Sequence, residues 1–587
     1  MTFSSAPGVL VLTNAGAAAP PRGVSDALGR AGLTRLRRVG EVWLTSWGHD
    51  PQLPTVDRPL LLSGPARRDG AVVGDGQVAV LLREGDVAEL GHFLPPFGAV
   101  GLTDGGLRIA VDRMGLRQVY WCRGPGWDAA STSARLLGRL LGRGWDEEAV
   151  LVQSQVGWQL GGRTLYLGVT KLAPGASLLV SRAGLRVSED DSQPSQPGST
   201  SLDEAVDHAA GVLRRTMSTY VDEATDPLLQ LTGGMDSRLV LSSVPVERRR
   251  GLRTMTLDVP GSADAVVARA VADRCGARHR VVALDGLGSV PPGEWFARVR
   301  TTAEMHDAML DPIAKAATDW AEEGVDQGNR LGGLGGEIGR GFYYTGRVRP
   351  ARVTRRRSER LAHWRVLANE AVEPEALHPR HRLAARAAAL DAIHTALVEA
   401  GDEWYGATDE LYYRPRMARW AGLAETVAST RRQLVNPLLH PEFIEMARAL
   451  SPRDKAQARF LGRLQMALDP ELGRMSLDGR PAPDAFAFPG PAARARQGLT
   501  QTRRAVHKAR QRARGARRPP AGGAVLAAGV LDHLRAHAAL ADPLRDSGWF
   551  DPRWLGEVLD GSVLPQPNTV AFMINVLVAQ DPGGAKP

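Results

Sequence analysis

The chain has 587 residues, which exceeds what one hydrophobic core supports and predicts two to four domains. Hydrophobic residues make up 43% and charged residues 23%, which excludes a disordered or fibrous protein. No apolar run approaches the ~20 residues of a membrane-spanning helix, no basic start of a secretory signal precedes the first apolar residues, and the two cysteines exclude a disulfide framework. We therefore expect a cytoplasmic protein without a membrane partner.

Residues 1–187 are predicted to be rich in β-strands. Glycine, proline and aspartate separate short apolar runs at 9–13, 41–47, 78–82 and 107–112, which we interpret as strands. The stretch 188–201 is rich in serine and proline and has almost no apolar side chains, which is typical of a linker. We therefore expect one domain at 1–187, a linker at 188–201 and a second domain at 202–587.

Strand and helix patterns alternate beyond the linker. Apolar residues recur at steps of three and four from Leu202 to Tyr220, which predicts an amphipathic helix. We expect strands at 228–231, 253–259 and 280–284, with helices from 238 onward and at 264–275. This alternation favours a parallel sheet in an α/β fold, and the pattern is mostly helical beyond about residue 300.

The segment Thr232–Ser237, with the sequence TGGMDS, stands between an expected strand and an expected helix. Its adjacent glycines allow close approach of a ligand to the backbone, and free N–H groups at a helix start favour an anion. Asp236 could hold the Mg²⁺ that accompanies a polyphosphate. The alternative interpretation is a surface turn with a capping aspartate, but the flanking elements favour a phosphate loop. It is not a Walker A loop, because no glycine in the chain precedes a lysine.

Several motifs in the same order resemble the asparagine synthetase and β-lactam synthetase family. TGGMDS is similar to the SGGxDS pyrophosphate loop of ATP pyrophosphatases, and LGGLGGEIGRGFY at 331–343 is similar to the second signature, LSGxGGDELFGGY. The segment Asn436–His440 resembles the P-F-L-D segment of the family. In the N-terminal part, 112–121 and 163–175 resemble a strand and a hairpin of the glutaminase-type domain.

The resemblance implies a fold, an activity and a site. The fold would be a degenerate glutaminase-type (Ntn-like) β-rich sandwich, followed by a doubly wound parallel-sheet ATP-pyrophosphatase domain with a mostly helical C-terminal part. The family adenylates a carboxylate with ATP and Mg²⁺, releases pyrophosphate, and lets an amine attack the acyl-AMP. Pyrophosphate would contact Thr232, Gly233, Gly234, Met235, Asp236 and Ser237, and adenine and ribose would contact Leu231, Leu257, Gly332 and Gly333. Asp236 and Glu337 would ligate Mg²⁺.

Departures from the family pattern limit what the resemblance implies. Thr2 stands where the glutaminases of the family have a nucleophilic cysteine, so we expect no glutamine hydrolysis. Leu334 replaces the family's catalytic Glu or Tyr, and Ile338 replaces an acid, so neither can transfer a proton. The family's lysine for acyl transfer aligns best with Arg459, with Lys455 as the competing candidate. Arginine keeps the positive charge but does not act as a base.

The formal net charge is +9, and ten basic residues without an acid lie at 494–518. We interpret 494–518 as a solvated basic insertion; binding of RNA or an acidic peptide is the alternative, and the lack of aromatic residues there argues against nucleic acid.

Four functions follow from these patterns. We expect an AMP-forming amide ligase without glutaminase activity, acting on a small-molecule or peptide carboxylate, for example in natural-product biosynthesis. The alternatives are a lasso-peptide macrolactam cyclase, an ATP-binding regulatory protein without catalysis and, less favoured, an RNA-modifying enzyme. The oligomeric state stays open, and a homodimer is one possibility.

Overall fold

The computed structural model describes residues 5–14, 19–33, 35–48, 53–189, 196–259, 262–344, 346–367, 370–490 and 521–580. Thr2 and the basic insertion at 494–518 lie outside these residues, as do residues 190–195 of the expected linker. Within the described ranges, none of the helices combines the length and the apolar character needed to cross a membrane.

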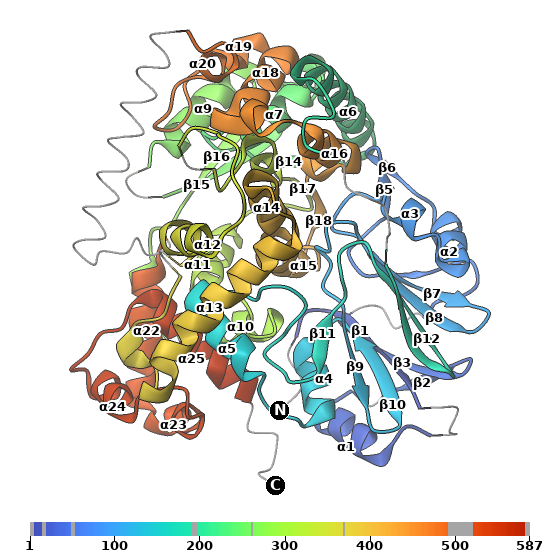
Figure 1. Cartoon of the computed structure of the whole chain (residues 1–587), viewed down its shortest axis with the longest axis vertical. Coiled ribbons are helices and arrows are strands. Elements are labelled where there is room, and N and C mark those ends of the chain that lie inside the picture. The colour runs from blue at the N-terminus through green and yellow to red at the C-terminus, as the bar shows by residue number, and fades with distance from the viewer. Residues whose placement is uncertain are drawn as a thin grey trace.

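The N-terminal part contains two antiparallel sheets that stack on each other (Figure 1). Strand order in the first sheet is β11-β9-β10-β1-β3-β2, and in the second it is β13-β12-β8-β7-β4. The strands of the first sheet are β1 (Gly8–Thr13), β2 (Arg37–Val39), β3 (Val42–Trp47), β9 (Tyr120–Gly124), β10 (Trp127–Ser131) and β11 (Val169–Lys171). Those of the second are β4 (Leu60–Leu61), β7 (Gly98–Thr103), β8 (Gly106–Val111), β12 (Ser177–Ser181) and β13 (Gly184–Ser188), and a separate hairpin consists of β5 (Arg67–Arg68) and β6 (Ala71–Val72).

Alternation of side chains along β1 explains the layering. Val9 and Val11 face the second sheet and pack with Ile109 in the core between the sheets, whereas Leu10 and Leu12 face the opposite side. The helices α1 (Arg22–Arg30) and α4 (Ala134–Leu141) cover the outer face of the first sheet, and α2 (Asp75–Glu84) and α3 (Val87–Leu90) cover the second. The predicted β-rich sandwich is confirmed.

One predicted strand in this part is wrong. The apolar run 78–82 lies in the helix α2, where Val78 and Leu82 are fully buried against Ala99 and Ala110 of the second sheet. Residues four apart share one face of a helix, so a run of five apolar residues can bury a helix face as well as a strand.

The second part is built on a parallel sheet with strand order β16-β15-β14-β17-β18. The strands are β14 (Leu228–Gln230), β15 (Arg253–Asp258), β16 (Arg278–Ala283), β17 (Asn329–Leu331) and β18 (Gln433–Val435). The chain builds outward from β14 to β16 in one direction and continues with β17 on the other side of β14. This reversal makes the carboxyl ends of β14 and β17 the place where ligands bind in open α/β sheets.

Helices surround this sheet and make up most of the C-terminal part, as predicted (Figure 1). Those before β17 are α6 (Leu202–Glu223), α7 (Asp236–Ser243), α8 (Val246–Arg249), α9 (Asp264–Cys275), α10 (Pro292–Met305) and α11 (Pro312–Glu322). Those between β17 and β18 are α12 (Arg355–Leu361), α13 (Pro379–Glu399), α14 (Trp404–Leu411) and α15 (Gly422–Ala428), with the π-helical segments η3 (Ala362–Val366) and η5 (Tyr412–Ala421).

Later helices complete the fold. They are α16 (Pro441–Ala449), α17 (Pro452–Lys455), α18 (Arg459–Leu468), α19 (Pro470–Gly473), α20 (Asp484–Ala487), α22 (Gly523–Ala536), α23 (Asp542–Asp546), α24 (Pro552–Asp560) and α25 (Pro567–Gln580). The helix α5 (Glu147–Val156) leaves the N-terminal sandwich and packs against α13, so the two parts share a hydrophobic core.

The long helix α6 begins at Leu202, where the sequence predicts it. The Ser201 hydroxyl accepts the N–H of Glu204, and the Glu204 carboxylate in turn accepts the N–H of Ser201 at 3.1 Å, which is a capping box.

A buried loop joins the sandwich to the helical part. The Asp112 carboxylate accepts backbone N–H groups from Met114 and Leu116, both at 3.0 Å, and so fixes the loop that follows β8. From this loop, Gln118 donates through Nε2 to the carbonyl of Ala418 at 2.8 Å. The motif that resembles a glutaminase strand therefore positions the sandwich against η5.

Candidate active site

The loop Thr232–Ser237 leaves the carboxyl end of β14 and folds on itself. The N–H of Thr232 donates to Ser237 Oγ at 2.9 Å, and the N–H of Gly234 donates to Thr232 Oγ1 at 3.1 Å. The N–H of Gly233 donates to Asp264 at the start of α9 at 2.7 Å. These bonds hold a tight turn whose hydroxyl groups lie inside it, directly before the N-terminus of α7.

A second loop, Gly332–Glu337, leaves the carboxyl end of β17 and lies against the first. A Cβ atom on Gly333 would come within 2.7 Å of the Ser237 nitrogen, and one on Gly336 within 2.3 Å of Asp236 Oδ1. Glycine is required at 333 because the two loops touch there through their backbones, whereas a side chain at 336 would collide with the side chain of Asp236. The two motifs that the sequence singled out are therefore brought together at the switch point of the sheet.

Two carboxylates and one guanidinium meet where the loops touch. Arg340 Nη2 lies 3.0 Å from Glu337 Oε1 and 3.9 Å from Asp236 Oδ2. Burial, and secondarily the charge of Glu337, raises the pKa of Asp236 to about 7. The Tyr412 hydroxyl also contacts the Glu337 carboxylate, and burial, followed by the Glu337 charge, raises the pKa of that phenol well above its ordinary value.

This carboxylate pair fits a hard divalent cation. Asp236 Oδ1 is buried and has no hydrogen-bond partner among the described residues, and the side chains of Asp236 and Glu337 are 19% and 22% exposed. An unpartnered carboxylate oxygen beside a second carboxylate offers the oxygen ligands that Mg²⁺ prefers. Arg340 supplies a balancing positive charge to the pair.

A comparison with known protein families agrees with the interpretation of this part of the chain. Residues 209–290 match the family model for asparagine synthase, and this segment runs from α6 to beyond β16 and includes the loop 232–237. The chain has an asparagine synthetase-like domain. The predicted resemblance to the asparagine synthetase family is confirmed for residues 209–290.

Other comparisons add little to this domain assignment. No curated protein matches the chain. The structure of the allosteric regulatory enzyme of purine biosynthesis is similar at 10% identity, covering 49% of this chain and 76% of that one with a TM-score of 0.18. Glutamine phosphoribosylpyrophosphate amidotransferase from B. subtilis, complexed with ADP and GMP, is similar at 11% identity, covering 48% and 75%, also with a TM-score of 0.18.

The expected nucleotide contacts of the asparagine synthetase-like domain lie around the two loops. Leu231 is fully buried, and its N–H donates to the Met255 carbonyl at 2.9 Å. Leu257 lies near the carboxyl end of β15, beside β14. Gly332 donates its N–H to the Val435 carbonyl at 3.0 Å, and Met235 is buried. Their contacts with adenine and ribose stay a prediction.

The two candidates for the cationic residue of acyl transfer occupy different environments. Lys455 is buried, and its Nζ lies 2.7 Å from Asp409 Oδ2, which also accepts the Tyr344 hydroxyl at 2.8 Å. Arg459 is 44% exposed at the start of α18 and pairs with Asp454 at 3.0 Å. An exposed cation can reach a substrate more readily than one locked in a buried pair, so this contrast favours Arg459.

Sequence reasoning missed Arg238, which follows the loop directly. Its buried guanidinium donates to the carbonyls of Leu472, Met475 and Ser476 at 3.1, 2.5 and 2.8 Å. These bonds hold the segment 472–478 beside the loop, where the N–H of Asp478 donates to the Gly233 carbonyl at 2.9 Å. The arginine after TGGMDS was the signal, but its partners lie more than 200 positions away in the chain.

Leu334 lies half-buried and packs against the main core of the domain. Ile338 is buried in the same core. Both side chains serve packing at positions where the family has acids or a tyrosine, so proton transfer from these positions is excluded.

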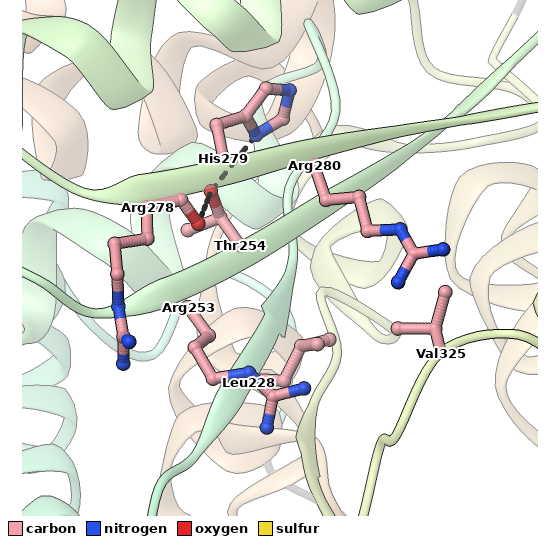
Figure 2. Close-up of a pocket in the computed structure, with 7 residues that line it drawn as sticks. All are labelled: Leu228, Arg253, Thr254, Arg278, His279, Arg280 and Val325. Carbon is pink, nitrogen blue, oxygen red and sulfur yellow. Dashed lines mark hydrogen bonds between the residues drawn. The ribbon is translucent and has the colours of Figure 1, made fainter.

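A cavity of about 340 Å³ lies at the opposite edge of the parallel sheet (Figure 2). Its lining includes the first residues of three strands, Leu228, Arg253 and Arg278, whereas the two loops leave the carboxyl ends. Arg253 and Arg278 are both paired with Asp226, at 2.8 and 3.4 Å. This cavity is therefore separate from the candidate active site.

Proposed function

We propose that the protein is an ATP-dependent, AMP-forming amide-bond ligase without glutaminase activity. It would adenylate the carboxylate of a small molecule or peptide, release pyrophosphate, and transfer the acyl group to an amine that the substrate already carries. The observation that carries this proposal is the contact between the loops 232–237 and 332–337 at the switch point of the parallel sheet.

Electrostatics explains why these residues suit adenylation. The attacking carboxylate and the phosphate are both negatively charged and repel each other. Positive charge or hydrogen-bond donors near the two groups must therefore balance their negative charge. The N-terminus of α7 and the loop backbone would face the triphosphate, while Asp236 and Glu337 would hold Mg²⁺. When bound, Mg²⁺ supplies charge neutralisation on the phosphate oxygens. Arg459 would support the later acyl transfer by charge alone, since arginine does not act as a base.

Exchange of pyrophosphate into ATP tests the adenylation step. We expect the wild-type chain to catalyse exchange that depends on a carboxylate substrate and Mg²⁺, and Asp236→Asn to reduce it at least a hundredfold. Asp104→Asn is the matched control, because Asp104 is exposed in the turn between β7 and β8 of the N-terminal sandwich. Full exchange activity in Asp236→Asn would contradict the proposal.

A glutaminase assay tests the second half of the proposal. We expect no glutamate from glutamine, because Thr2 replaces the expected cysteine. Glutamine turnover that Thr2→Ala abolishes would contradict this expectation and assign threonine as an N-terminal nucleophile.

A regulatory ATP-binding protein is a second candidate, and the apolar packing of the half-buried Leu334 and the buried Ile338 favours it. This candidate predicts ATP binding in calorimetry without release of AMP over a broad carboxylate screen. The lasso-peptide cyclase is a special case of the first proposal, in which one peptide supplies both the carboxylate and the amine. Either reaction would take place in the cytoplasm, where ATP is abundant.

A further inference from the structure

The cavity at the amino-terminal edge of the parallel sheet gathers three arginines. Arg253 begins β15, and Arg278 and Arg280 are the first and third residues of β16. Arg253 and Arg278 are register partners in these parallel strands, and alternate residues of a strand share one face of the sheet. The three side chains therefore belong to the same face, and all three line the cavity (Figure 2).

The other face of the same strands carries Thr254 and His279, which also line the cavity. Thr254 Oγ1 lies 2.9 Å from His279 Nδ1, so these two side chains bond to each other. In Figure 2 the His279 ring lies on one side of β16, and the Arg280 side chain extends from the other side toward Val325. The arginines are therefore the groups that can bind a ligand on the side of Val325.

One carboxylate contacts these arginines. Asp226 Oδ2 lies 2.8 Å from Arg253 Nη1, and Asp226 Oδ1 lies 3.4 Å from Arg278 Nη2. Asp326 accepts a hydrogen bond from Arg253 through its backbone carbonyl, while its carboxylate accepts the N–H of Gly328 at 3.1 Å. Three guanidinium groups thus face a single carboxylate, which leaves an excess of two positive charges in the cavity.

The guanidinium of Arg280 is free to bind a ligand. Among the residues that the structure describes, no carboxylate oxygen lies within 4.0 Å of it, and it donates no hydrogen bond. A Cβ atom on Gly324 would lie 3.7 Å from Arg280 Nη2, which places this guanidinium beside the loop that precedes β17. A planar guanidinium donates two parallel N–H groups to an oxyanion, so this arrangement favours binding of an anion.

The charge and the size of the cavity indicate the class of anion. A phosphate monoester carries nearly two negative charges at neutral pH, which matches the positive excess. The cavity of about 340 Å³ has room for roughly ten water molecules at ~30 Å³ each, which is more than a phosphate ion alone occupies. Leu228 and Val325 belong to a small apolar cluster with Met255 and line the cavity beside the arginines, so an organic group can pack there.

We propose that this cavity binds a phosphate monoester, with its phosphate group on Arg253, Arg278 and Arg280 and its organic group on Leu228 and Val325. Asp226 would act as an internal competitor, because its carboxylate occupies two of the three arginines in the free protein. The site lies at the amino ends of the strands, whereas the candidate active site lies at their carboxyl ends. The proposal is therefore independent of the ligase function.

Calorimetric titration of the full chain without ATP or Mg²⁺ tests the site. The probes are phenyl phosphate and phenyl sulfate, which share the ring and a tetrahedral oxyanion. Well above the second phosphate pKa of ~6, phenyl phosphate has one more negative charge than phenyl sulfate. We expect phenyl phosphate to bind about tenfold more tightly than phenyl sulfate, and more tightly than inorganic phosphate, which lacks the ring.

Variants of Arg280 locate the binding site of the probe. Arg280→Gln should weaken binding of phenyl phosphate about tenfold, and Arg280→Lys should weaken it less, because lysine keeps the charge but not the planar fork. Arg269→Gln is the matched control. Arg269 is exposed on α9 and acts electrostatically on His279, which belongs to the other face of the sheet. This variant should bind phenyl phosphate like the wild-type chain.

Asp226→Asn gives a test of opposite sign. The substitution removes the internal carboxylate and frees Arg253 and Arg278, so we expect phenyl phosphate to bind about threefold more tightly or better. Asp226 is 54% exposed, so the variant should fold, and circular dichroism checks this. Unchanged or weaker binding would show that Asp226 serves structure alone and would contradict the proposed competition.

Three further results would overturn the site. Equal affinities for phenyl phosphate and phenyl sulfate would contradict the charge match. Phenyl phosphate affinity that is the same in Arg280→Gln and in the wild-type chain would place the anion elsewhere, for example at the loop 232–237. Inorganic phosphate that binds as tightly as phenyl phosphate would show that the free ion, and not an ester, is the ligand.

Discussion

Arg340 Nη2 lies 3.0 Å from Oε1 of Glu337, so a cation already stands at the carboxylates expected to hold Mg²⁺. The same nitrogen lies 3.9 Å from Asp236 Oδ2. Two carboxylates close together repel each other unless a positive charge is near. Arg340 therefore stabilises the two carboxylates, and it competes with a divalent cation for binding to them.

Replacing Arg340 should strengthen binding of a divalent cation. We expect Arg340→Gln to lower the dissociation constant for Mn²⁺ in the absence of nucleotide about tenfold, because one unit charge within ~4 Å is removed. Electron paramagnetic resonance of free Mn²⁺ measures this directly. Arg355→Gln is the control, since Arg355 is exposed and pairs with Glu359 away from the loops. Unchanged or weaker Mn²⁺ binding in Arg340→Gln would contradict this account.

The close contact of the two loops predicts a steric effect at Gly333. A methyl group there would meet the backbone at Ser237 and Asp236, at 2.7 and 3.0 Å, and backbone atoms cannot rotate away. We expect Gly333→Ala to cost ~1–3 kcal/mol of unfolding free energy and to reduce pyrophosphate exchange at least a hundredfold. Gly288→Ala is the control, because a methyl group at that position would meet no atom within 4 Å. Normal exchange in Gly333→Ala would show that the loops do not act as one site.

Stability measurements separate Lys455 from Arg459. Lys455→Met leaves the buried Asp409 without its cation, so we expect a loss of ~3–5 kcal/mol of unfolding free energy. Arg459→Met removes an exposed ion pair and should cost less than ~1 kcal/mol, while the rate of amide formation falls strongly and pyrophosphate exchange persists. The opposite pattern, a stable Lys455→Met variant that cannot transfer the acyl group, would assign the role to Lys455.

The sequence predicts the parts of the site that are local in the chain. The loop 232–237 and the second signature each carry their glycines and their acid within a few residues, and the parallel sheet then brings both to one edge. The helix α9 has the predicted bounds, 264–275, because a glycine ends it. The helix α7 begins at Asp236 rather than at 238, so the predicted metal ligand lies in its first turn.

Long-range contacts could not be predicted in the same way. Arg365 and Arg416 are 51 positions apart and meet only because two π-helical segments turn toward Phe342. No periodicity in the sequence predicts a π-helix, because a π-helix arises from the packing around it and not from the intrinsic propensity of its residues. The same holds for the pairing of Lys455 with Asp409, which favours a structural role for this lysine.

His306, buried at the end of α10, should make the protein sensitive to acid. Burial, first among the causes, lowers the pKa of its imidazole to about 4, and its Nδ1 lies 2.7 Å from the Thr302 carbonyl. The unfolded chain takes up this proton at about pH 6.5 and the folded chain does not, so stability falls between pH 6.5 and 4, by up to ~3 kcal/mol.

Urea unfolding at several pH values measures this effect as a difference between variants. We expect His306→Asn to be less stable than the wild-type chain at pH 7 but to lose less stability on acidification, because it no longer has an imidazole to protonate. Lys315, Asp319 and Arg431 also face this histidine, so His92→Asn at an exposed site serves as the control and should follow the wild-type slope. If His306→Asn loses stability as steeply as the wild-type chain between pH 6.5 and 4, other buried groups govern the acid sensitivity.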